Sequence, residues 1–169
     1  MEIYLAHPGE NDGQNLTERG VWQMNALARR LRMERVSVGK VYANGHLVSA
    51  QSGDILSRTL RVPLVRDERF VEFDFGSLIA NPFSVDNDNI ESIHVFVDEL
   101  VRRGEDAIIA MDGGIHRAVI SRLTGLSLED TKHFDLSPAS LSVLQYASMN
   151  GTRGWRIASV NDTAHLHVP

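Results

Sequence analysis

The stretch Ala107-Ile108-Ile109-Ala110-Met111-Asp112-Gly113-Gly114 decides the fold class. Residues 107–111 form an unbroken apolar run, which is typical of a strand in the middle of a parallel sheet, buried on both faces. Asp112-Gly113-Gly114 predicts a tight turn from this strand into a helix that extends from Ile115 to about Thr124. A strand that leads directly into a helix is the basic unit of an α/β sheet.

Strand and helix patterns alternate on both sides of this stretch. The expected strands cover residues 3–6, 40–43, 141–146 and 155–160, and the expected further helices cover residues 16–31, 46–60 and 89–103. Thr17 is the expected N-cap of the first helix, and Gly104 the expected C-cap of the third. The first helix should bury one face, made of Val21, Met24, Leu27, Ala28 and Leu31. This alternation predicts a three-layer α/β fold with a mostly parallel central sheet and helices on both faces.

The chain length fits a single domain. Its 169 residues are close to the size of one domain, so we expect one domain over residues 1–169. Residues 61–88 are the exception to the regular pattern, because prolines and aspartates interrupt them. Phenylalanines recur inside that segment, which favours a loop-rich functional insertion over a linker.

Composition excludes several classes of protein. With 17 Lys and Arg against 22 Asp and Glu, the net charge is −5, which is not the basic footprint of a nucleic-acid binder. The absence of cysteine excludes disulfides, thiolate catalysis and zinc–thiolate sites. No apolar run approaches the roughly 20 residues that span a bilayer, and the N-terminus does not resemble a signal peptide. We therefore expect a cytoplasmic protein without nucleic-acid or membrane partners.

Two turns are candidate parts of a functional site. Ligands of open α/β sheets bind at the carboxyl ends of the strands. His7-Pro8-Gly9-Glu10 follows the first expected strand, and Asp112-Gly113-Gly114 follows the central one. We expect His7 and Asp112 to lie at neighbouring strand ends.

Several segments together resemble the histidine phosphatase superfamily, also called phosphoglycerate mutase-like. They share the order and spacing of that family over nearly the whole chain. The segments are Leu16-Thr17-x-x-Gly20, Arg69-Phe70-Val71-Glu72-x-x-Phe75-Gly76, Gly113-Gly114-x-x-Arg117, Gly125-Leu126, Trp155-Arg156 and Asn161-Asp162-Thr163-Ala164-His165-Leu166. The resemblance implies a phosphoglycerate mutase-like domain.

The resemblance also implies a phosphate pocket with two arginines, two histidines and an acidic proton donor. One histidine takes the phosphoryl group covalently, and the arginines supply fork-shaped cationic donors. This chain keeps the nucleophile position as His7. Ala6 stands in place of the first arginine, Val48 or Ser49 in place of the second, and Asp112 in place of the second histidine. Glu72 stands where the family places its proton donor.

The replaced positions make the expected pocket neutral to negative. An anion beside Asp112 and Glu72 is repelled, so we expect no ordinary phosphatase or mutase activity. The two carboxylates should also favour protonated His7. The expected catalytic trio is His7, Glu72 and Asp112. The expected ligand-binding residues are Glu10, Ser49, Gly113 and His116.

Three functions stay open at this point. The first is a pseudoenzyme that binds a small molecule other than phosphate in the ancestral cleft, or acts as a regulatory relative. The second is an enzyme that uses His7, Glu72 and Asp112 for acid/base work on a substrate without a phosphate. The third is a weak phosphomonoesterase with His7 as nucleophile, and with cations supplied by Arg117 or Arg69. One histidine and two carboxylates also suit a divalent metal such as Mn, Fe or Zn. Nothing in the spacing requires one, so no metal or cofactor is expected.

Each candidate residue also has a structural interpretation. Asp112 is a favoured N-cap for the helix that follows it. His7 can be a packed core histidine, and Glu72 a solvated loop carboxylate. His116 lies one turn into a helix, where a packed or a surface position is the ordinary role, and Arg117 can serve the structure alone.

Overall fold

The computed structural model describes residues 1–70, 86–149 and 151–167. Its strands are β1 (Glu2–Ala6), β2 (Lys40–Ala43), β3 (Leu64–Arg66), β4 (Ala107–Ala110), β5 (Leu141–Met149) and β6 (Thr152–Asp162). Its helices are α1 (Glu18–Met33), α2 (Leu47–Leu60), α4 (Asp86–Arg103) and α5 (Gly113–Thr124), with short 3-10 turns η1 (Asp130–His133) and η2 (Ala164–Leu166).

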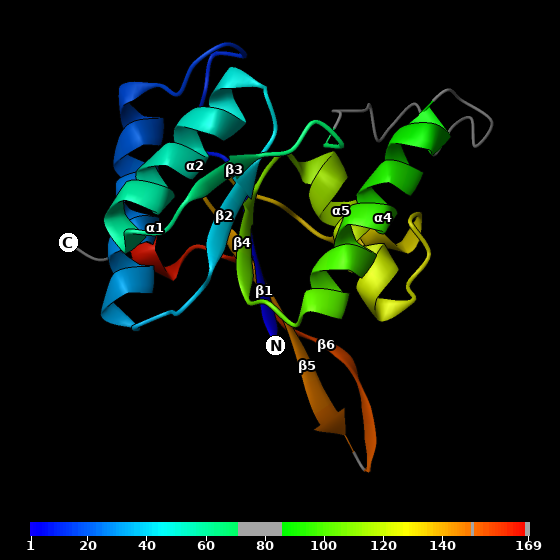
Figure 1. The fold of residues 1–169 in the computed structure, drawn as a ribbon. Coiled ribbons are helices and arrows are strands. Elements are labelled where there is room, and N and C mark those ends of the chain that lie inside the picture. Colours follow the sequence, from blue (N-terminus) through cyan, green and yellow to red (C-terminus); the bar gives the residue numbers. More distant parts are fainter. Residues whose placement is uncertain (71–85, 150, 168–169) are drawn as a thin grey trace.

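One six-stranded sheet organises the molecule, in the order β3-β2-β4-β1-β5-β6. The first four of these strands are parallel, whereas β5 and β6 are antiparallel to their neighbours. The β5–β6 hairpin continues past the body of the domain (Figure 1). This is the α/β architecture with a mostly parallel sheet that the sequence predicts.

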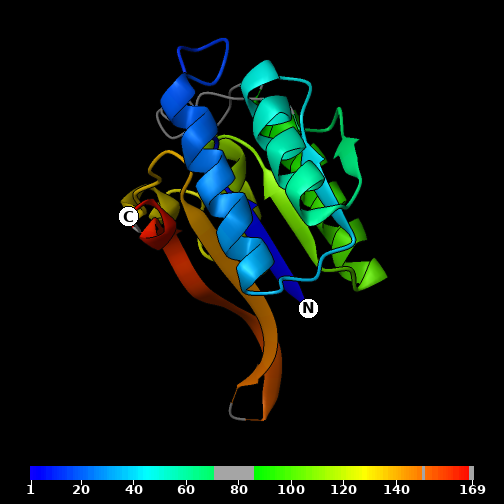
Figure 2. The ribbon, with the colours of Figure 1, turned by 90° about the vertical axis from the view of Figure 1, so that its left-hand side faces the viewer.

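Helices cover both faces of the sheet, so that the fold has three layers. Helices α1 and α2 lie on one face and α4 and α5 on the other, as Figure 2 shows from the side. Each face has its own apolar core: the α1 side includes Met24, Leu27 and Leu31, and the α5 side includes Ile115 and Val119. In β4 all four residues are buried, because alternate side chains enter the two cores.

Helix α1 begins at the expected N-cap, Thr17, but fewer of its apolar side chains are buried than the sequence predicts. The Thr17 side chain accepts a hydrogen bond from the Gly20 amide at 3.0 Å, which is an N-cap. Met24, Leu27 and Leu31 are fully buried, but Val21 is 41% exposed. The expectation of a buried Val21 is therefore wrong, because the first turn of α1 packs through its backbone instead. A Cβ on Gly20 would lie 1.9 Å from the carbonyl oxygen of Glu10.

Element boundaries differ from the sequence expectations in four places. The segment expected to be irregular contains β3, which pairs with β2, and α4 begins at Asp86 rather than at residue 89. Both strands of the late hairpin are longer than expected. The turns η1 and η2 had no sequence signal. No described helix is long and apolar enough to cross a membrane.

Candidate functional site

The two turns singled out in the sequence meet at one edge of the sheet. Strands β1 and β4 pair in parallel with Ala6 opposite Ala110, so the residues that follow them emerge side by side. A cavity of about 290 Å³ opens there. It is lined by His7, Pro8, Asn11, Gly13, His46, Val48, Ser49 and Asp112. The expected neighbourhood of His7 and Asp112 is confirmed.

His7 is held with one ring nitrogen tied to the backbone. Its amide donates to the carbonyl of Ser140 at 2.9 Å, and its ring Nδ1 lies 3.2 Å from the carbonyl oxygen of Pro8. Since that oxygen can only accept, Nδ1 carries the proton, and Nε2 of the neutral ring keeps its lone pair. Nε2 lies toward Gly113, where a Cβ would come within 3.6 Å of it.

The protonation of His7 differs from the expectation. Burial lowers the pKa of His7 below its ordinary value of 6.5, and the Arg117 cation lowers it further, although the bond to Pro8 acts in the opposite direction. Desolvation disfavours the charged ring. The described surroundings therefore favour neutral His7, whereas the expected influence of Glu72 lies outside the described residues.

Asp112 closes the N-terminus of α5. Its Oδ1 accepts hydrogen bonds from the amides of Gly114 at 2.7 Å and of Ile115 at 3.1 Å. The structural interpretation of Asp112 as an N-cap is thus confirmed. The carboxylate lines the cavity at the same time. The N-terminus of a helix is a natural anion site, and here the chain's own carboxylate occupies it.

The two arginines considered as substitute cations have other partners. Arg117 donates from Nε to the carbonyl of Thr131 at 3.2 Å, from Nη1 to that of Gly113 at 3.2 Å and from Nη2 to that of Phe134 at 2.7 Å. It therefore ties α5 to the η1 turn. Arg69 pairs with Asp67 at 2.7 Å and with Glu99 at 2.9 Å. Neither arginine lines the cavity.

The expected ligand-binding residues separate into two groups. Ser49 lines the cavity, and Gly113 lies next to the His7 ring. Glu10 is not part of the lining, because its carboxylate accepts from the Thr17 hydroxyl at 2.9 Å and its carbonyl from the Thr17 amide at 3.0 Å. It thereby fastens the loop after β1 to the start of α1.

His116 is a core residue beside His7. Its side chain is 1% exposed, and the two imidazole rings meet edge to face with centroids 5.7 Å apart. Burial lowers the pKa of His116 to about 3, and a charge on His7 would lower it further. His116 is therefore neutral, and it is not among the residues that line the cavity. Its burial agrees with a packing role, and its expected role in ligand binding stays a prediction.

Glu72 lies outside the described residues, so its place in the trio stays a prediction. Among the residues that the structure describes, no three His, Asp or Glu side chains form a group that could hold a metal ion.

Sequence reasoning missed three cavity residues, namely Asn11, Gly13 and His46. His46 is the N-cap residue of α2 and follows β2 after only two residues. The rule that ligands bind beyond the carboxyl ends of parallel strands would have found it. Asn11 and Gly13 belong to the loop after β1, whose course depends on the Asn11–Leu16 bridge and has no pattern in the sequence.

Comparisons with known proteins agree on one family. The model of the histidine phosphatase superfamily (branch 1) matches residues 8–92 and 87–163. The probable phosphoglycerate mutase GpmB of Yersinia pestis is 23% identical over 215 aligned positions, which take in 100% of this chain and 96% of that protein.

Solved structures share the fold. A mycobacterial glucosyl-3-phosphoglycerate phosphatase superposes with a TM-score of 0.73 at 15% identity, over 95% of this chain and 98% of that one. The alpha-ribazole phosphatase from Shigella flexneri superposes with a TM-score of 0.75 at 16% identity, over 96% and 97%. These likenesses confirm the three-layer architecture.

Proposed function

The chain belongs to the histidine phosphatase superfamily, and from this premise we propose that its cavity has lost phosphate binding and holds a small ligand without a phosphate group. The observation that carries the proposal is the Asp112 carboxylate on the amides of Gly114 and Ile115. A bound phosphate would have to displace this internal anion or lie against it.

The charges around the cavity support the same conclusion. Among the described residues, the lining contains one carboxylate and no arginine or lysine, and burial favours neutral His7. A hydrogen bond to a charged group contributes about 1.5–3 kcal/mol, so two missing arginines remove about 3–6 kcal/mol. At 1.4 kcal/mol for each factor of ten, phosphate binding weakens by about two to four orders of magnitude. Repulsion by the Asp112 carboxylate weakens phosphate binding further.

The remaining lining fits a neutral or cationic polar ligand. Asn11, His46 and Ser49 offer amide, imidazole and hydroxyl groups, and Asp112 offers the oxygens of an anion. Pro8 and Val48 add apolar contact. A volume of about 290 Å³ suits a small molecule. The protein then acts as a binding or regulatory relative of the phosphatases and mutases, as a pseudoenzyme of this family.

The experiment restores the missing cations. Calorimetric titration with inorganic phosphate compares the unchanged protein with the triple variant Ala6→Arg, Asp112→His and Ser49→Arg, and with the version that carries Val48→Arg instead. We expect binding by at least one restored protein and none by the unchanged one. A matched control makes the same charge changes at exposed positions outside the cavity, with Ser37→Arg, Thr152→Arg and Glu68→His. Phosphate binding by the control as well would assign the effect to net charge and defeat the proposal.

A weak phosphomonoesterase is the second candidate function, and the His7 tautomer is the observation that favours it. With Nδ1 on the Pro8 carbonyl, Nε2 of neutral His7 has the lone pair that a nucleophile needs. Arg117 lies close by, since both it and His7 approach the same face of Gly113. Turnover of p-nitrophenyl phosphate that His7→Ala abolishes would establish this activity. Turnover that His7→Ala leaves unchanged, or none at all, would exclude it.

A further inference from the structure

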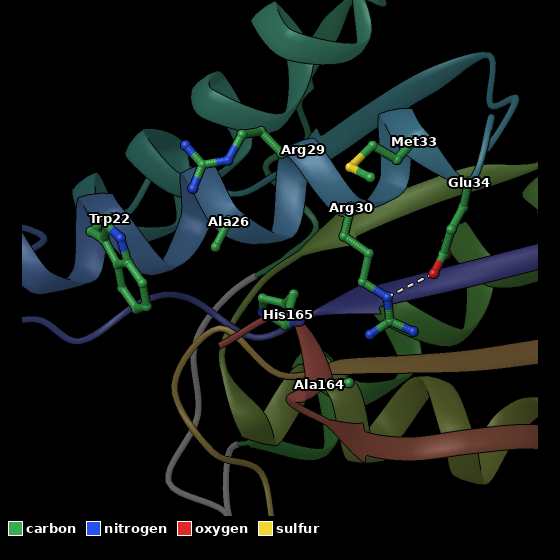
Figure 3. Close-up of a pocket in the computed structure, with 8 residues that line it drawn as sticks. All are labelled: Trp22, Ala26, Arg29, Arg30, Met33, Glu34, Ala164 and His165. Atoms are coloured by element: carbon green, nitrogen blue, oxygen red, sulfur yellow. Dashed lines mark hydrogen bonds and ion pairs between the residues drawn. The ribbon is translucent and has the colours of Figure 1, made fainter. Parts of the chain in front are cut away.

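A second and larger cavity lies between α1 and η2, the short turn that follows β6. Its volume is about 640 Å³, within the range of ligand sites in proteins. Figure 3 shows α1 along one side of it and η2 on the other. It is lined by Trp22, Ala26, Arg29, Arg30, Met33, Glu34, Ala164 and His165. None of these residues belongs to the His7 cavity.

Apolar side chains give this cavity a surface for a flat molecule. Trp22 is 47% exposed and Met33 is 83% exposed, although both are large hydrophobic residues. Trp22, Ala26 and Met33 recur at the spacing of one helix face, and the cavity lies along that face (Figure 3). An exposed aromatic ring beside a hollow is a platform on which another ring can stack.

One buried donor inside the cavity lacks a partner. Arg30 donates from Nε to Glu34 at 2.8 Å and from Nη2 to Asp162 at 2.7 Å, but its buried Nη1 has no hydrogen bond within the described chain. His165 is 5% exposed, and its ring interacts with the backbone of Ala139. A buried donor without an acceptor is costly, so Nη1 of Arg30 favours a ligand that supplies an acceptor.

The cations of the lining favour an anion as that acceptor. The described lining holds two arginines, Arg29 and Arg30, and one carboxylate, Glu34. Arg30 is paired with Glu34 and with Asp162, which lies outside the lining, so these four charges sum to zero. Arg29 is exposed at the cavity and makes no ion pair with the described residues, so it is the cation of this group whose partner is not already fixed.

We propose that this cavity binds a small amphipathic anion, with a flat apolar body against Trp22, one carboxylate or sulfonate group on the unused Nη1 of Arg30, and the Arg29 cation at the rim. A second copy of the chain is a poorer fit. A stable interface needs about 800 Å² from each partner, and α1 exposes only three large apolar side chains among the described residues, Val21, Trp22 and Met33.

A pair of matched probes tests the proposal. 1-Anilinonaphthalene-8-sulfonate carries an aromatic body and a sulfonate, and N-phenyl-1-naphthylamine has the same body without the charge. We expect the sulfonate to bind one-to-one with a fluorescence rise and with energy transfer from Trp22. Trp155→Phe leaves Trp22 as the sole tryptophan, since the chain has two. Calorimetry gives the stoichiometry without relying on either tryptophan.

The test uses substitutions at two exposed positions, which should not disturb the folded core. Arg29→Gln should weaken binding of the sulfonate probe about tenfold and leave the uncharged probe unchanged, whereas Trp22→Ser should weaken both. Arg32→Gln is the control, because Arg32 is an exposed arginine of the same helix outside this cavity. Equal binding by all three variants would overturn the proposal. A dimer that forms with rising protein concentration in sedimentation, and that Trp22→Ser abolishes, would also overturn the proposal. In that case this face of α1 would bind a second copy of the chain.

Discussion

Replacing Asp112 with alanine should lower stability and create a phosphate site in one step. The carboxylate caps two α5 amides, and loss of such a cap costs about 1–2 kcal/mol. For a chain of this length, that loss corresponds to a fall in Tm of about 2–8 °C. Asp112→Ala leaves the two amides and the positive end of the α5 dipole facing the cavity. Added phosphate at ten times its Kd should then raise the free energy of unfolding of Asp112→Ala by about 1.4 kcal/mol.

The assay is thermal unfolding of both proteins in a series of phosphate concentrations at constant ionic strength. Asp112→Asn is the matched control, because the asparagine oxygen still caps the helix while the negative charge is gone. We expect little loss of Tm and a weaker phosphate effect for Asp112→Asn than for Asp112→Ala. The reasoning is refuted if phosphate raises the Tm of the unchanged protein as much as that of Asp112→Ala.

Three further predictions concern packing and protonation. Gly20→Ala should cost about 3 kcal/mol or more in urea unfolding, because its Cβ would strike the Glu10 carbonyl, whereas Gly45→Ala, with no atom within 4 Å, should cost little. His116 has a pKa of about 3 in the fold against 6.5 in the unfolded chain, so only the unfolded chain takes up its proton as pH falls from 6.5 toward 3. The free energy of unfolding should therefore fall between pH 7 and pH 5, and His116→Gln should lose about 1–2 kcal/mol less over that range; an unchanged slope would contradict this. Arg117→Gln should cost about 2–3 kcal/mol and raise hydrogen exchange in η1, because three backbone carbonyls each lose one donor, although that of Thr131 keeps the Phe134 amide; protection equal to that of the unchanged protein would contradict it.

The sequence predicted the sheet better than its surroundings. The apolar runs at β1, β2 and β4 predicted these strands correctly, because short apolar runs of this kind are typical of strands that are buried on both faces of a parallel sheet. The sequence did not predict strand β3, because this strand has only three residues and follows Pro63. Val21 shares the spacing of the buried face of α1. Spacing predicts the side of the helix on which a residue lies, but not how far its side chain is buried. The β5–β6 hairpin is longer than its apolar pattern because it continues past the body of the domain (Figure 1).

The site was predictable where it follows from strand ends and not where it depends on burial. His7 and Asp112 were placed together because parallel neighbouring strands end at the same edge. The sequence did not predict the neutral His7 that the described surroundings favour, since it shows nearby carboxylates but neither the depth of the ring nor the approach of Arg117. His116 looked like a ligand residue because of its place beside the glycine turn, and only the fold shows it beneath His7.

Calorimetric titration of the unchanged protein with inorganic phosphate shows most directly whether the cavity holds phosphate, with His7→Ala titrated in parallel. We predict no heat of binding from either protein at millimolar phosphate. One-to-one binding with a micromolar Kd that His7→Ala abolishes would contradict the account.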